Sequence, residues 1–287
     1  MSAARIVDQG YRSYDGPRGG VFEAMRTLTL FSLGRAMGIR RGLWPKILPI
    51  SIVAISFLPA IVFVGMAALL PEEIVDELIA YGEYYGYITA AILLFTAFVA
   101  PELLCTDRRT RMLGLYFASP LNRMTYLASK ATTVAIALTF VTMGPPLLML
   151  LAYTLEGVGP DSVGEFLGLL VRIVLAGVVI SAVHTSLSLA VSSFTDRNGL
   201  ASAGVIFILL LTPVIANSLV EGADAPDAIL ALDLFSMPFE LVTRIFDGVE
   251  YGYPQLSTGF LVVVNLGWTL LFAALVVWRY RRIEVTK

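Results

Sequence analysis

The sequence contains few residues that could hold a metal ion or form a disulfide. It has one cysteine, Cys105, and one histidine, His184. A disulfide needs two cysteines, and structural zinc sites draw their four ligands mainly from cysteine and histidine. The sequence therefore excludes an internal disulfide and the usual zinc sites. It also lacks the glycine-rich Gly-Lys-Ser/Thr loop that holds nucleotide phosphates, so we expect no nucleotide, cofactor or ATPase activity in this chain itself.

Charged residues are also scarce. Only 15% of the 287 residues are charged and 57% are hydrophobic, with a mean hydropathy of +0.80. A soluble globule needs more polar surface than this composition supplies. The net charge of −2 gives no basis for binding nucleic acid. The chain is therefore predicted to lie in a lipid bilayer, where α-helices satisfy their own backbone hydrogen bonds.

Long apolar runs follow one another along the chain. A run of about 18 residues or more can cross the roughly 30 Å hydrocarbon core as a helix. The runs of this length lie at approximately 47–70, 86–104, 128–153, 166–193, 199–220 and 258–278. We therefore predict an all-α, polytopic membrane protein with six transmembrane helices. We expect no cleavable signal before the first span, which is predicted to serve as its own insertion signal.

The basic residues predict the orientation. Eighteen of the 20 Lys and Arg residues lie before the first span, between the second and third, between the fourth and fifth, or after the sixth. The other three loops hold only Arg244 and are otherwise acidic. Because short cytoplasmic loops carry the excess of Lys and Arg, both termini and residues 105–130 are predicted to be cytoplasmic. We expect the protein in the plasma membrane.

The segments outside the spans differ in character. Residues 1–20 are predicted to form an irregular cytoplasmic tail, and 21–287 one transmembrane domain. Within that domain, residues 21–44 predict an amphipathic helix at the inner membrane surface, although Arg35 interrupts its apolar face. In the external loop 221–257, apolar residues at helical spacing predict a short helix resting on or dipping into the outer leaflet.

Two polar residues of the spans could have a function. His184 lies in the fourth span and could line a transport path, or form a hydrogen bond between helices, which is the more common role. Glu102 lies near the inner end of the second span and could form an ion pair with Arg108 or Arg109, or bind a substrate or proton. No chain of titrating groups supports a proton-driven carrier, and no nucleophile with a base supports an embedded enzyme.

Residues 107–118 predict a short cytoplasmic helix between the second and third spans. Asp107 is a possible N-cap, and Ser119-Pro120 is expected to stop the helix. Met112, Leu115 and Tyr116 share one face. Such a helix could transmit force from a cytoplasmic partner, or the loop could merely fix the topology through its positive charge.

A resemblance to a known family favours the first reading. The stretch "DRRTRMLGLYFASPLNRMTYLASKA", residues 107–131, resembles a segment of ABC-2-type transporter permeases. The match consists of Asp107-Arg108, the leucine-rich residues 113–115, Ser119-Pro120-Leu121 and Lys130. The stretch departs from the family pattern where Arg-Met-Leu-Gly replaces Gly-Thr-Leu-Glu. With the arrangement of spans, the resemblance covers about residues 21–280.

The resemblance implies a function and partners. Two such permeases, identical or related, pair in the bilayer and bind two cytoplasmic ABC ATPase subunits, which hold ATP and Mg²⁺. An exporter of an amphipathic, lipid-like or drug-like substrate is expected. A membrane scaffold subunit and a gradient-driven secondary carrier are the alternatives. The residues then expected to couple the permease to the ATPase are Asp107, Arg108, Arg109, Arg111, Met112, Leu115, Tyr116, Ser119 and Pro120.

We expect a charged residue in place of Tyr116 or Met112 to uncouple ATP hydrolysis from transport, because these side chains would fill the groove of the ATPase. The measurement compares ATP hydrolysis and transport in membranes that contain equal amounts of inserted protein. Normal transport by both variants would refute a docking role for these two residues.

Overall fold

Six helices long and apolar enough to cross a membrane make up most of the protein. The computed structural model describes residues 19–39, 42–70, 81–246 and 253–283, and within these every regular element is a helix. The candidate spans are Lys46–Ala67 in α2 (Trp44–Ala67), Thr89–Arg109 in three pieces, α8 (Arg123–Glu156), α9 (Val163–Ser193), α10 (Asn198–Ala223) and α12 (Thr258–Arg282). The predicted all-α fold with six spans is confirmed.

The spans begin and end at specific capping residues. The side chain of Asn122 accepts from the backbone N–H of Thr125 and starts α8, and Ser162 and Ser257 cap α9 and α12 in the same way. Gly157 ends α8 in a left-handed conformation, with φ 82°. These caps satisfy backbone groups that would otherwise be unpaired at the helix ends, and they set the short connections between neighbouring spans.

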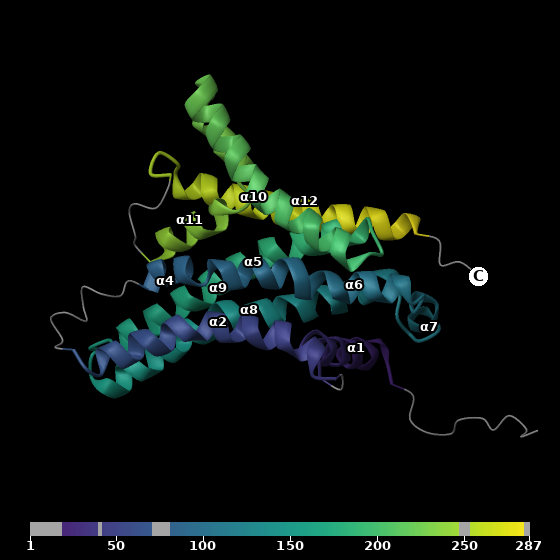
Figure 1. Cartoon of the computed structure of the whole chain (residues 1–287), viewed down its shortest axis with the longest axis horizontal. Coiled ribbons are helices and arrows are strands. Elements are labelled where there is room, and N and C mark those ends of the chain that lie inside the picture. Colours follow the sequence, from purple (N-terminus) through teal and green to yellow (C-terminus); the bar gives the residue numbers. More distant parts are fainter. Residues whose placement is uncertain (1–18, 40–41, 71–80, 247–252, 284–287) are drawn as a thin grey trace, which may run out of the picture.

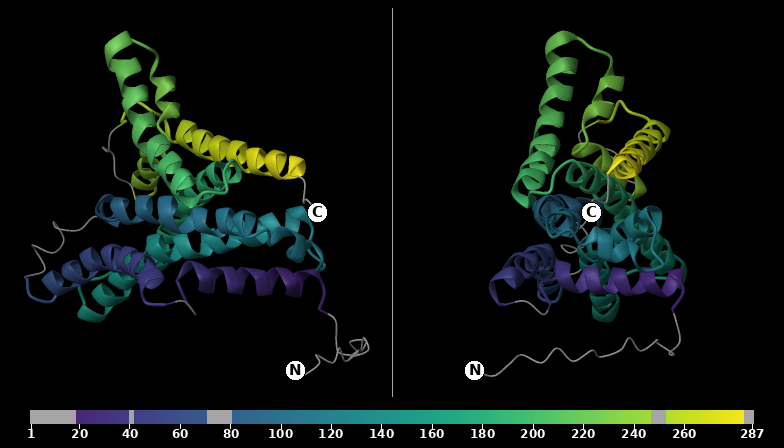
Figure 2. Two further views of the ribbon diagram at one scale, coloured as in Figure 1. Left: turned by 45° about the vertical axis from the view of Figure 1, so that its right-hand side comes forward. Right: turned by 90° about the vertical axis from the view of Figure 1, so that its right-hand side faces the viewer.

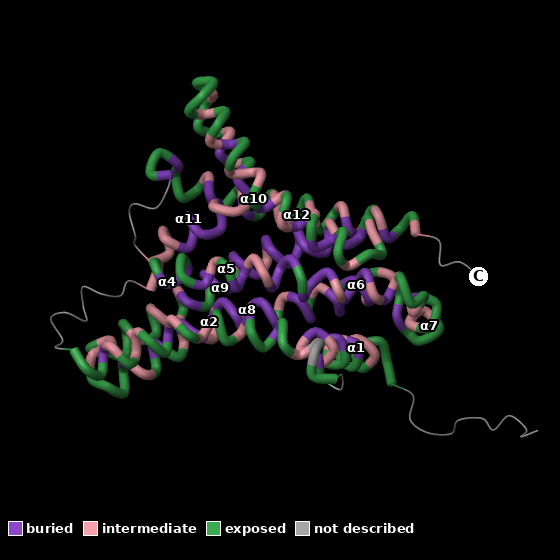
Figure 3. The backbone as a smooth tube through the Cα atoms, in the orientation of Figure 1, coloured by how far each residue is buried: buried purple, intermediate pink, exposed green. Residues whose placement is uncertain are grey.

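The helices α8 and α9 form the centre of the bundle. They pack against each other, α2 covers α8, and α12 covers α9 (Figure 1). Buried positions gather where the spans face one another, whereas the far end of α10 leans away from the bundle and is exposed (Figure 3). In a bilayer, such an exposed apolar helix faces lipid or another protein chain.

The second span is divided by a short π-helix. It consists of α5 (Thr89–Leu94), the π-helical segment η1 (Phe95–Val99) and α6 (Ala100–Arg109). The hydroxyl of Ser188 on α9 donates to the carbonyl of Thr96 at 2.9 Å. A π-turn leaves the regular helical ladder, and this side chain supplies a partner for one of its buried carbonyl groups.

The first helix lies across one end of the bundle. Figure 2 shows α1 (Val21–Ala36) along its length in the view in which α12 is foreshortened. The helix predicted for residues 21–44 is shorter in the structure because Gly38 adopts a left-handed conformation, with φ 69°. There the N–H of Ile39 turns back to the carbonyl of Gly34 at 2.8 Å. The helix packs against α6 and α8.

The segment between α10 and α12 folds onto the bundle. It contains η2 (Asp227–Leu232) and α11 (Ser236–Ile245), whose residues Phe239 and Val242 are buried in the protein core. This apolar face packs against α4, α9 and α12, and the predicted position of the helix at the outer leaflet stays a prediction. Two side chains of α12 hold the segment, since Trp268 donates to the carbonyl of Ala231 at 2.7 Å and Asn265 to that of Met237 at 3.2 Å.

Some predicted segments lie outside the described residues. They are most of the tail 1–20, the acidic stretch 71–80, residues 247–252 and the last four residues.

Candidate functional site

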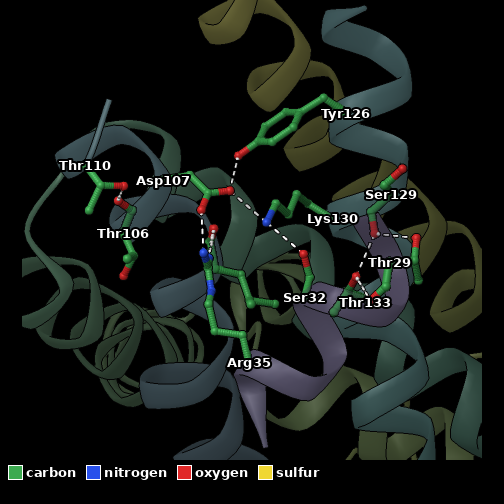
Figure 4. A network of polar contacts seen from close by, with 11 residues as sticks. Thr29, Ser32, Arg35, Thr106, Asp107, Thr110, Tyr126, Ser129, Lys130 and Thr133 are labelled. Carbon is green, nitrogen blue, oxygen red and sulfur yellow. Dashed lines mark hydrogen bonds and ion pairs between the residues drawn. The ribbon is translucent and has the colours of Figure 1, made fainter. Parts of the chain in front are cut away.

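A buried carboxylate joins three helices at the end of the bundle where α1 lies. Asp107, in the last turn of α6, is fully buried. Its Oδ1 accepts a hydrogen bond from Nη1 of Arg35 on α1 at 2.6 Å, and its Oδ2 lies 2.7 Å from Nζ of Lys130 on α8 (Figure 4). Helices that are far apart in sequence therefore share one anion.

Neutral groups complete this cluster. The hydroxyl of Tyr126 donates to Oδ2 of Asp107 at 3.0 Å, and Nζ of Lys130 donates to the hydroxyl of Ser32 at 2.9 Å. Nη2 of Arg35 donates to the carbonyl of Leu103 at 3.0 Å. Because buried charges are tolerated when their hydrogen bonds are satisfied, these contacts let the ions lie inside the protein. We call Arg35, Asp107, Tyr126 and Lys130 the Asp107 cluster.

The next residue ties α6 to the end of α9. Nη1 of Arg108 donates to the carbonyls of Ser193 at 2.6 Å and of Thr195 at 2.9 Å. The last carbonyls of a helix have no partner within it and carry the negative end of the helix dipole. The guanidinium of Arg108 donates hydrogen bonds to carbonyls at this end of α9, and its positive charge interacts favourably with the negative end of the helix dipole. Arg108 therefore fixes the last turn of the second span to the end of the fourth.

The predicted single helix over 107–118 is not present. Instead α6 ends at Arg109, Arg111 turns through a left-handed conformation with φ 55°, and α7 covers Leu113–Phe117. Asp107 therefore lies inside α6, where it forms buried ion pairs with residues of α1 and α8, and it is not an N-cap. The prediction was wrong because the apolar run of the second span does not reveal that its helix continues to Arg109.

The turn and α7 present an exposed tip. Its exposed side chains are Arg109, Thr110, Arg111, Leu115, Ala118, Ser119 and Pro120. Leu115 leaves 64% of its surface exposed, which makes it the apolar residue at the tip that a partner could cover. Figure 1 shows this tip, α1 and the end of α12 at the same end of the molecule.

The face predicted to contain Met112, Leu115 and Tyr116 is divided in the structure. Tyr116 turns inward, with its ring 5.7 Å from that of Tyr126 and 5.7 Å from Nζ of Lys130. Burial raises the pKa of Tyr116. Met112 is only partly exposed. A charged residue at position 116 would therefore disturb the Asp107 cluster as well as any docking surface.

A groove runs between the tip and α1. It encloses about 390 Å³ and is lined from one side by Glu23, Thr27 and Phe31 of α1 and from the other by Tyr116 and Ser119. Phe31 is about half exposed. The groove and Leu115 together give this end of the protein a partly apolar surface with basic residues beside it.

The two intramembrane candidates lie apart from the tip. His184 is fully buried on α9, its Nδ1 lies 2.8 Å from the carbonyl of Ile180, and its ring meets that of Phe239 on α11 edge to face. Its polar contact is thus within its own helix, not between helices. Glu102 is partly exposed on α6. In the part of the chain that the structure describes, no group of three metal-ligating side chains occurs.

A match to a protein family agrees with the all-helical fold and its six candidate spans. The family model described as "ABC-2 family transporter protein" matches residues 54–285. The chain belongs to this family. It is therefore a multi-pass membrane protein of the ABC-2 permease type, and membership implies association with ABC ATPase subunits. The comparison with curated proteins found no match.

The residue that sequence reasoning missed in this ABC-2 permease is Arg35. It interrupts the apolar face of α1, and the structure shows that it points inward to Asp107. A lone charge on an otherwise apolar helical face signals a buried partner, but the sequence does not show which acid of another helix supplies it.

We expect Asp107→Asn to lower the stability of this ABC-2 permease by about 3–5 kcal/mol, because two buried cations then lose their anion. Thermal unfolding in detergent, followed by size-exclusion chromatography, measures the change. The exposed Asp161→Asn is the matched control and should change stability by less than about 1 kcal/mol. Lys130→Met should partly restore the stability of Asp107→Asn, since it removes one uncompensated charge. Equal melting temperatures for Asp107→Asn and Asp161→Asn would contradict the account.

Proposed function

We propose that this chain is the membrane-spanning permease subunit of an ATP-driven exporter in the plasma membrane. A separate cytoplasmic ABC ATPase subunit docks on the exposed tip at residues 109–120 and on the adjacent groove of α1. The substrate is amphipathic, lipid-like or drug-like. Two permease chains, identical or related, pair around the transport path, each with an ATPase subunit that binds ATP and Mg²⁺.

The observation that carries the proposal is the rigid attachment of an exposed tip to several spans. The Asp107 cluster connects the inner end of α6 to α1 and α8, and Arg108 connects it to α9. Displacement of the tip by a partner therefore moves the inner ends of the second, third and fourth spans together. A loop that only fixed topology would need none of these buried bonds.

The direction of the chain in the membrane follows from its charges. Arg109 and Arg111 of the tip lie at the same end of the molecule as Arg279, Arg281 and Arg282 of α12. Basic residues beside spans favour the cytoplasmic side. We therefore assign the tip and both termini to the cytoplasm, where the ATPase and its nucleotide are available.

The surfaces of α2 and α10 are the proposed contact with the second permease chain. The α10 helix packs only partly on the bundle and exposes Phe207, Leu210 and Val214. Close packing between membrane helices favours apolar faces of this kind. The substrate class is inferred from the many aromatic residues and from the few charges within the spans.

Leu115→Asp is expected to reduce co-purification of the ATPase subunit by about tenfold or more, because a charge replaces the exposed apolar anchor. The measurement is affinity purification of tagged permease from its native membrane, with ATP hydrolysis and substrate export assayed in parallel. Leu155→Asp, at an exposed leucine on the far end of α8, is the matched control and should retain the ATPase.

Each result of this experiment separates the alternatives. Unchanged capture of the ATPase by Leu115→Asp would overturn docking at the tip. Capture of an ATPase without any ATP-dependent export would favour a scaffold subunit. Transport that follows an ion gradient without an ATPase would favour a secondary carrier.

Single-cysteine labelling tests the orientation. In a Cys105→Ala background, a membrane-impermeant maleimide should label Asp161→Cys in intact cells but label Ser119→Cys only after permeabilisation. Both positions are exposed in the structure. The reverse pattern would show that the tip faces outward and would exclude docking of a cytoplasmic ATPase.

A further inference from the structure

A cavity with aromatic walls lies at the end of the protein opposite the tip. It has a volume of about 470 Å³ and is formed by α4 (Tyr81–Tyr87), α10 and the segment around α11. The residues that define its chemistry are Tyr85, Asn217, Phe235, Phe239, Glu240 and Tyr253. The volume falls in the range of about 300–1,000 Å³ that is typical of pockets for small molecules.

Tyr85 lines this cavity and has a buried hydroxyl that is unsatisfied. Its side chain is only 1% exposed, it lines the cavity, and its hydroxyl has no hydrogen-bond partner among the described residues. A buried hydroxyl without a partner costs about 1–3 kcal/mol relative to a bonded one. A ligand that offers a hydrogen bond at this position would recover that free energy.

The polar network behind the cavity has an excess of negative charge. Oε1 of Glu240 accepts from Arg244 at 3.1 Å and its Oε2 from the backbone N–H of Tyr253 at 3.4 Å. The hydroxyl of Tyr253 in turn donates to the buried Asp233 at 2.7 Å. Of these charged groups Glu240 lines the cavity, whereas Asp233 and Arg244 do not, and Arg244 also donates to the carbonyls of Tyr253 and Leu256.

Tyr253 does not add to this charge. Burial and its hydrogen bond to Asp233 raise the pKa of Tyr253 to about 12, so the phenol stays neutral near pH 7. It therefore acts in the network as a donor to Asp233, while it accepts from Nδ2 of Asn217 at 2.8 Å.

We propose that this cavity binds an amphipathic organic cation with a planar aromatic body and N–H donors. The faces of Phe235 and Phe239 would stabilise the positive charge, as aromatic rings do for organic cations. Glu240 and Tyr85 would accept hydrogen bonds from the N–H groups. An organic anion would meet the carboxylate of Glu240 without its cationic partner, because Arg244 does not line the cavity.

The inference rests on the proposed function only in assigning this cation to the substrate class of the exporter. Binding itself needs neither the ATPase nor transport. The site can therefore be tested on the purified full-length permease alone, and the two ideas can fail separately.

The test uses ethidium, a planar aromatic cation with two amino groups, and measures its fluorescence on titration with the permease in detergent. Its reduced form, hydroethidine, keeps the ring frame and the amino groups but has no positive charge. Ethidium should bind saturably, and hydroethidine should compete about tenfold more weakly, because it loses the cation–π and carboxylate interactions. Equal affinity for the two compounds would overturn the proposal.

Matched variants locate the site. Phe239→Leu removes an aromatic wall but keeps an apolar side chain, and it should weaken ethidium binding about three- to tenfold while changing hydroethidine binding little. Phe272→Leu is the control, because that ring stacks on Trp268 outside the cavity. Should Phe239→Leu fail to fold, Phe235→Leu provides the same test at the neighbouring ring, whose centroid lies 5.7 Å from that of Phe239. Equal ethidium affinities for the wall variant and the control would refute binding in this cavity.

The outcomes distinguish the inference from the proposed function. Specific ethidium binding in a permease that shows no ATP-dependent export would retain the site and remove the exporter assignment. ATP-dependent export by a permease that does not bind ethidium would retain the exporter and remove this cavity as its cation site.

Discussion

The organisation of the end of the bundle at which α1 lies depends on one buried anion, Asp107. Its carboxylate is the shared partner of Arg35 and Lys130, and neither cation could lie at this depth without it. A nonspecific apolar contact would allow α1 to slide along the bundle. An ion pair with hydrogen bonds on three sides fixes both its rotation and its depth, so the interfacial helix becomes part of the transmembrane domain.

The sequence predicted the spans well because the bilayer imposes one requirement on every spanning helix, a long apolar run. It predicted less about α6 and α7, where the residues that decide the structure act across the chain. Arg111 adopts a left-handed conformation that no local pattern marks, and Tyr116 turns inward toward a tyrosine of α8. Hydropathy predicted an apolar face on α11 but not that α4, α9 and α12 pack against it, because an apolar face does not reveal whether lipid or protein covers it.

The candidate site was predicted only in part, because contacts between distant residues decide much of its structure. The basic, leucine-containing segment around 107–120 could be recognised from the sequence, and Leu115 is exposed there. The sequence did not show which residues of the segment are buried and which are exposed. Asp107 and Arg108 form buried contacts that connect the spans, whereas Arg109 and Arg111 are exposed. Only the tertiary structure distinguishes the residues that attach the tip to the bundle from those that form its surface.

The π-helical turn at Phe95–Val99 has a consequence for the two ends of the second span. In a regular α-helix each residue advances about 100° around the axis, so the facing of Thr89, which lines the aromatic cavity, would dictate that of Asp107 eighteen residues later. A π-turn accommodates an extra residue and shifts this phase between its two sides. The half of the span that begins at Thr89 can therefore be oriented for the aromatic cavity and the half that ends at Arg109 for the ion cluster, although both belong to one span.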